Sequence, residues 1–106
     1  MGVYYYFHNI TRDECNEASI PPFNLSFIAK LNSYPEDVVL NIFSSLIEVN
    51  GWDKMDHIRA APDYHDYSVI EYNKGVIEYI EPEQFEYDEQ IKKKLYDIMN
   101  DYTHDV

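Results

Sequence analysis

Residues 33–51 read SYPEDVVLNIFSSLIEVNG and contain the clearest structural signal in the chain. Ser33 and Glu36 have the spacing of a capping box, and Pro35 falls in the first turn, where its missing N–H costs little. Gly51 is typical of a left-handed helix C-cap. The stretch therefore predicts a helix that packs on a core. The apolar residues between its two ends recur at helical spacing and form one wide stripe: Val38, Val39, Ile42, Phe43, Leu46 and Ile47.

Runs of β-branched and aromatic residues lie on both sides of this helix and predict strands. Residues 3–8, VYYYFH, are apolar on both alternating faces, so this strand is expected inside a sheet or under a covered face. Residues 57–61, HIRAA, predict a short strand. Residues 67–80, YSVIEYNKGVIEYI, predict a hairpin whose turn uses Gly75 for a positive φ.

Two further helical segments complete the predicted order of elements. The sequence allows a short helix over Asn24 to Leu31, and a longer one is expected from about Asp88 to Tyr102. The main elements then run strand, helix, three strands, helix. This order predicts an α+β fold, with a small, mostly antiparallel sheet of about four strands and two main helices on one face. Neither a repeat nor a linker interrupts residues 1–106, so we expect a single domain.

The charge of the chain restricts the partners that it can attract. Twenty acidic residues oppose eight basic ones, which gives a formal net charge of −12. Such a field repels nucleic acid and anionic membranes and speeds encounters with basic surfaces. Direct nucleic-acid binding is disfavoured, because its affinity comes largely from lysine and arginine contacts to phosphates. The expected partner is a basic protein.

Cysteine usage and the N-terminal sequence favour an intracellular protein. Cys15 is the single cysteine, so an internal disulfide is excluded. Its neighbours Asp13, Glu14 and Glu17 raise the pKa of a thiol, which argues against a catalytic role. The first residues lack the pattern of a signal peptide, and no apolar run is long enough to cross a bilayer. We therefore expect a cytoplasmic location.

Residues 78–89, EYIEPEQFEYDE, combine six carboxylates with three aromatic rings and no basic residue. The segment could be a solvated connection between the hairpin and the last helix, where acids near a helix N-terminus are favourable. Asp88 and Glu89 alone satisfy that need, however, and crowded carboxylates repel one another. The alternative hypothesis is a contact surface for a positively charged partner. Its predicted contact residues are Glu78, Tyr79, Glu81, Glu83, Glu86, Tyr87, Asp88 and Glu89.

Other aromatic residues form a second candidate contact set. It comprises the outward tyrosines of the first strand, Tyr4 and Tyr6, and the loop residues Tyr64 and Tyr67. Coverage of a small core is the competing explanation for these rings. Trp52, just after the predicted helix, is expected to fill the core.

A group of histidines and aspartates raises the question of metal chemistry. Imidazole and carboxylate groups can hold a divalent ion that activates water. Their spacing matches no known metal motif, and loops of a carboxylate-rich chain often have such a composition. The sequence also lacks a nucleophile elbow and a glycine-rich phosphate loop, so we expect neither an enzyme nor a bound cofactor or metal. The group consists of Asp56, His57, Asp63, His65 and Asp66.

Charge, size and the lack of a catalytic motif favour a non-enzymatic interaction protein. We expect an inhibitor of the anti-defence or DNA-mimic kind that viruses and mobile elements carry, which docks an acidic, tyrosine-rich surface onto a basic, nucleic-acid-handling protein. An immunity protein that neutralises a basic nuclease toxin requires the same electrostatics. Two other possibilities are a small metal-dependent enzyme centred on His57 and His65, and a subunit whose acidity only keeps it soluble.

Overall fold

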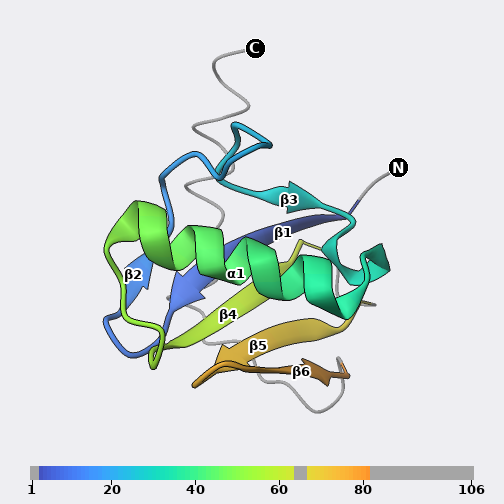
Figure 1. Ribbon diagram of the computed structural model, residues 1–106. Coiled ribbons are helices and arrows are strands. Elements are labelled where there is room, and N and C mark those ends of the chain that lie inside the picture. The colour runs from blue at the N-terminus through green and yellow to red at the C-terminus, as the bar shows by residue number, and fades with distance from the viewer. Residues whose placement is uncertain (1–2, 64–66, 82–106) are drawn as a thin grey trace.

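The computed structural model describes residues 3–63 and 67–81 of the 106-residue chain (Figure 1). Among these residues one α-helix, α1, lies across one face of an antiparallel sheet. None of the helices in these two ranges is long and apolar enough to span a membrane. The elements are β1 (Tyr4–Asn9), β2 (Glu14–Cys15), β3 (Ile28–Ala29), the 3-10 helix η1 (Leu31–Ser33), α1 (Glu36–Asn50), β4 (His57–Pro62), β5 (Val69–Asn73) and β6 (Val76–Ile80).

The sheet has six strands in the order β2-β1-β4-β5-β6, and β3 also pairs with β1. Every pair is antiparallel. The expectation that the first strand lies inside the sheet is confirmed, because β1 pairs with β4 on one side and with β2 and β3 on the other. The predicted strand at residues 57–61 and the predicted hairpin are confirmed as β4 and as β5–β6.

The predicted fold class was wrong. The described residues form a six-stranded sheet with one α-helix, so the fold is mostly β rather than an α+β fold of about four strands and two main helices. The missed strands, β2 and β3, have two residues each, which is too short to produce a visible alternation. β3 also lies where the sequence allowed a helix over Asn24 to Leu31. The helix expected over Asp88 to Tyr102 lies outside the described residues.

The two ends of α1 differ in how well the sequence predicted them. Pro35 occupies the N-cap position without a side-chain hydrogen bond, so the predicted capping box does not form. Ser33 instead donates its Oγ–H to the carbonyl of Lys30, at 2.7 Å, and closes η1. At the other end the prediction is confirmed, because Gly51 has φ 67° and its N–H bonds to carbonyls of the last helical turn.

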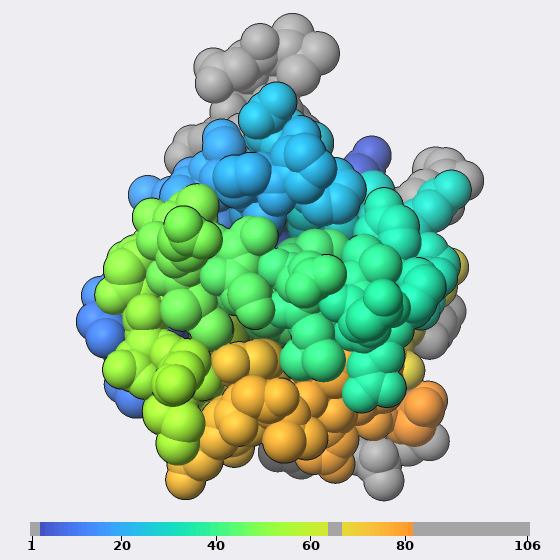
Figure 2. Space-filling model, viewed as in Figure 1, coloured from blue at the N-terminus to red at the C-terminus, as the bar shows by residue number. Residues whose placement is uncertain are grey.

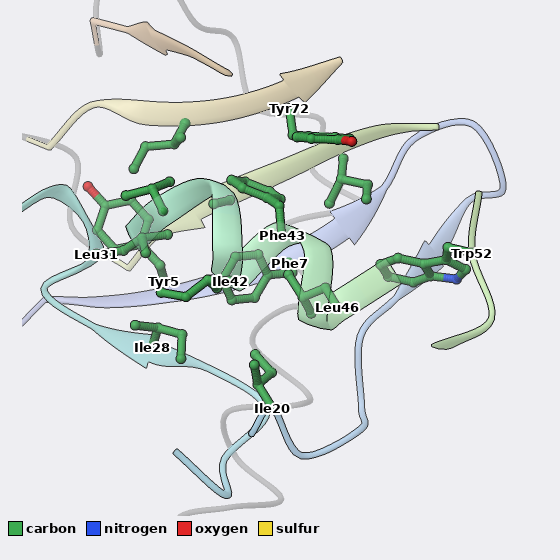
Figure 3. Close-up of a cluster of buried hydrophobic side chains, with 14 of the residues drawn as sticks. Tyr5, Phe7, Ile20, Ile28, Leu31, Ile42, Phe43, Leu46, Trp52 and Tyr72 are labelled. Carbon is green, nitrogen blue, oxygen red and sulfur yellow. The ribbon is translucent and has the colours of Figure 1, made fainter. Parts of the chain in front are cut away.

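The core lies between α1 and the face of the sheet that the helix covers (Figure 3). The ring of Phe43 from α1 meets Phe7 of β1 edge-on, with centroids 5.7 Å apart, and stacks on Tyr72 of β5 at 5.3 Å. Trp52 is 6% exposed and belongs to this cluster, as predicted. The buried apolar area on these rings supplies the main stabilisation of the fold.

Candidate functional site

The β5–β6 hairpin places its second strand at an edge of the sheet. Two residues connect the strands, Lys74 with φ 54° and Gly75 with φ 85°. Positive φ at both positions defines the turn type that matches the twist of antiparallel strands. β6 pairs with β5, and no other strand in the described parts of the chain pairs with its outer side. The hairpin therefore presents an edge with one row of backbone groups facing outward.

Side chains along this edge are unusually exposed for their size. Val76 is 68% exposed and Tyr79 is 41% exposed. Glu78 and Glu81 are exposed as well. Because side chains of a strand alternate between its two faces, Glu78 lies on the face opposite to Tyr79. Figure 2 shows that α1 and the hairpin form one continuous face of the molecule. Ile77 packs against the core beneath α1, and Tyr79, two residues further along β6, lies on the same side of the sheet.

An acidic residue from the helix joins Tyr79 at this edge. Glu36, in the exposed first turn of α1, interacts electrostatically with the Tyr79 phenol. Partial burial of the ring raises the pKa of Tyr79 above its ordinary value, and the Glu36 carboxylate raises this pKa further. The phenol is a hydrogen-bond donor at neutral pH, as an ordinary tyrosine is. Glu81 lies on the same side, with its Oε1 3.5 Å from the Ser68 Oγ.

We call the surface formed by Glu36, Glu78, Tyr79 and Glu81 the acidic edge. Sequence analysis missed Glu36, because only the tertiary packing of α1 on the hairpin brings it beside Tyr79. The acidic first turn of α1 was the one available signal. The acidic edge therefore combines residues that are far apart in the sequence.

The described arginines bind carboxylates of the sheet and of the turn before β4, and one of these, Glu71, lies directly opposite Glu78. Arg59 of β4 binds the Glu71 carboxylate at 2.6 Å, and His57 lies 3.0 Å from the other oxygen of that carboxylate. Arg12 binds Asp56 at 2.8 Å. Among the residues that the structure describes, the printed arginine ion pairs are with Glu71 and Asp56 and not with Glu36, Glu78 or Glu81.

The structure describes three of the eight predicted contact residues. Glu78, Tyr79 and Glu81 lie at the acidic edge, although Glu78 and Tyr79 lie on opposite faces of it. The other five predicted residues lie outside the described residues: Glu83, Glu86, Tyr87, Asp88 and Glu89.

The candidate metal group does not converge in the part of the chain that is described. Asp56 is buried at the start of β4, where it accepts hydrogen bonds from Asn9 and Arg12. Asp63 lies beyond the other end of β4 and accepts the backbone N–H of Tyr4. Within residues 3–63 and 67–81, no cluster of three histidine, cysteine or carboxylate side chains could hold a metal ion. His65 and Asp66 lie outside these ranges.

The second contact set is divided by burial. Tyr4 is 40% exposed, whereas Tyr6 is 4% exposed. The ring of Phe27 lies against both tyrosines, with centroid distances of 5.3 Å. Burial raises the pKa of Tyr6 above its ordinary value, and Asp63 adds to this increase. Tyr6 is therefore a packing residue, while Tyr4 and Tyr67 keep exposed surface. Tyr64 is outside the described residues.

Comparisons with protein-family models, with curated proteins and with solved structures found no match to this chain.

Proposed function

We propose that this protein is a non-enzymatic acidic interaction protein that binds and inhibits a basic, nucleic-acid-handling protein. The observation that supports this proposal most is the acidic edge, where the exposed Tyr79, acted on electrostatically by Glu36, lies between Glu78 and Glu81 in the chain, on a strand that no other described strand pairs with on its outer side. A net charge of −12 attracts a basic surface over long range. Long-range attraction by the net charge would bring the partner close, and the acidic edge would then make the contacts.

The chemistry of the acidic edge suits arginine and lysine side chains. A carboxylate accepts two parallel N–H bonds from one guanidinium group, which gives orientation as well as affinity. The face of the Tyr79 ring can hold a cation nearby, and its protonated hydroxyl can bond to a partner carbonyl. Spaced carboxylates beside aromatic rings resemble the phosphates and bases to which nucleic-acid-handling proteins bind. Inhibitors of the DNA-mimic and anti-defence kind, which viruses and mobile elements carry, use this principle.

An immunity protein directed against a basic nuclease toxin is the second candidate, because the same acidic edge and the same net charge would serve it. The two candidates differ in the partner. An antagonist blocks a host or defence protein that handles nucleic acid, whereas an immunity protein blocks a toxin that is encoded together with it.

Affinity capture tests the proposed function. The full chain, immobilised through an N-terminal tag, is incubated with lysate of the source organism at low and at high salt, and duplex DNA is added as a competitor. We expect a basic nucleic-acid-binding protein that is retained at low salt and released by either salt or DNA. If the captured protein is a toxin nuclease and the chain suppresses its activity, the chain is an immunity protein. If no basic protein shows salt-dependent retention, the proposed function is wrong.

A further inference from the structure

The register of the hairpin determines which backbone groups of β6 face outward. Asn73 and Val76 flank the two-residue turn and are paired. In such a hairpin the flanking residues exchange both backbone hydrogen bonds, and pairs with and without these bonds then alternate along the ladder. Glu78 consequently bonds to β5, while Ile77 and Tyr79 direct their N–H and C=O groups away from it.

Within Val76–Ile80, β6 carries none of the residues that usually protect an edge against another strand. Exposed edges are commonly blocked by lysine, proline or a bulge. β6 contains none of these over Val76–Ile80, and it exposes the side chains of Val76 and Tyr79. Glu78 is its charged residue. A carboxylate there opposes a second acidic chain and favours a basic one.

A second copy of this chain is a poor occupant of the edge. Each copy has a net charge of −12. An antiparallel copy centred on Glu78 would place two Glu78 carboxylates side by side, and like charges that are directly opposed destabilise strand pairing. Charge complementarity therefore selects a basic partner segment over self-association.

We propose that the β6 edge binds an extended, basic segment of the partner protein as an additional strand of the sheet. This inference rests on the proposed function and specifies how the partner binds. The segment would hydrogen-bond to the outward backbone groups of Ile77 and Tyr79. Beside Glu78 it would carry lysine or arginine, and beside the exposed Tyr79, on the other face of the strand, a β-branched residue. The alternation of the two residue types follows from the alternation of β6 itself.

The probe is a synthetic acetylated peptide of about nine residues that alternates valine with lysine or arginine, long enough to span a strand. Two further versions carry N-methyl groups on alternate amides, one version for each edge of the peptide. A bound strand directs one set of its amides toward β6. We therefore expect one methylated version to lose binding and the other to retain it.

Backbone amide exchange of the full chain gives the direct readout. We expect the amides of Ile77 and Tyr79 to exchange several-fold more slowly when the unmethylated peptide is bound. Tyr79→Pro removes the outward N–H without removing a bond to β5, and Tyr79→Ala removes the same ring but keeps the N–H. The proline variant should bind the peptide about fivefold more weakly than the alanine variant. If the proline variant does not fold, amide exchange in the unmodified chain decides.

Several results would overturn the inference. One is peptide binding that leaves Ile77 and Tyr79 exchanging at their original rates, with both methylated versions bound equally. This result does not contradict the proposed function. The proposed function is contradicted separately, if affinity capture finds no basic partner. Failure of the peptide to bind also overturns the inference. Protection that appears when the protein alone is concentrated, together with a dimer in sedimentation, assigns the edge to a second copy instead.

Discussion

At the scale of single residues, the carboxylates of this chain fall into two groups. Asp56 and Glu71 are held by hydrogen bonds and by arginine, and they stabilise the fold. Glu36, Glu78 and Glu81 are exposed. The net charge therefore overstates the acidity of the exposed surface, because Asp56 and Glu71 are paired with arginines.

Asp56 connects β1, the turn after it and the start of β4. Its Oδ2 accepts the Asn9 side-chain N–H at 2.9 Å and the Arg12 guanidinium at 2.8 Å. The Asn9 side chain is buried, so Asp56→Ala would leave its amide without this acceptor. We expect the free energy of unfolding at neutral pH to fall by about 1–3 kcal/mol, measured by urea denaturation. Glu48→Ala, on an exposed position of α1, is the control and should change it by less than about 0.5 kcal/mol.

The same pair of proteins tests the pH dependence. The hydrogen bond from Asn9, assisted by Arg12, holds the pKa of Asp56 below its ordinary value of 3.8, against the opposing effect of burial. A lowered pKa means that the stabilisation is complete above this ordinary value and is lost as the pH falls through the lowered one. The difference in unfolding free energy between the wild type and Asp56→Ala should therefore shrink in acid. A difference that stays constant down to strongly acidic pH would contradict this role.

Tyr79 reports the geometry of the acidic edge. Burial and the Glu36 carboxylate both raise the pKa of its phenol above 10.0. Glu36→Gln removes the negative charge and keeps the shape, so the pKa of Tyr79 should move down toward its ordinary value. NMR titration of the Tyr79 ring carbons measures it, and Glu17→Gln serves as a distant control. An unchanged Tyr79 pKa in Glu36→Gln would show that the carboxylate and the phenol do not interact.

At the scale of elements, periodicity predicted the long segments and failed for the short ones. α1, β1, β4 and the β5–β6 hairpin each carry a hydrophobic pattern long enough to identify. β2 and β3 are strands only because β1 lies beside them, and pairing with a distant strand has no local signature. The capping box failed for a similar reason, since the Ser33 hydroxyl bonds within η1.

Part of the candidate site was also named from the sequence. Glu78, Tyr79 and Glu81 were named from composition, because acidic and aromatic residues alternate in one short segment. The division of Glu78 and Tyr79 between two faces follows from strand alternation and was accessible from the sequence. The role of Glu36 was not accessible from the sequence, because its electrostatic effect on Tyr79 depends on how α1 crosses the sheet.

The C-terminus of α1 gives a prediction about an element boundary. Gly51 has φ 67°, and a Cβ there would meet no atom within 4 Å. Backbone strain, not a clash with a neighbour, therefore determines the effect of a substitution. Gly51→Ala should lower the free energy of unfolding by about 1 kcal/mol, and Gly51→Asn by less, because asparagine tolerates the left-handed region. Thermal and urea denaturation of the two variants check the order, and an alanine variant as stable as the wild type would refute it.

At the scale of the whole molecule, acidic side chains lie at both ends of the sheet and of α1. The acidic edge lies at one side of the sheet, and β2 lies at the opposite side. Glu17 follows β2, and Glu48 lies in the last turn of α1, at the other end of the helix from Glu36. Substitutions at these two positions change the net charge without touching the acidic edge. They separate long-range attraction from local contact.

The most direct measurement is calorimetric titration of the captured partner, purified, with the wild type and with two double variants. Glu36→Gln with Glu81→Gln alters the acidic edge, and Glu17→Gln with Glu48→Gln removes the same charge elsewhere. We predict that the first pair weakens binding at least about tenfold more than the second at low salt, as expected for the loss of charged hydrogen bonds at a contact. Equal losses in the two double variants would contradict the assignment of the acidic edge as the contact surface.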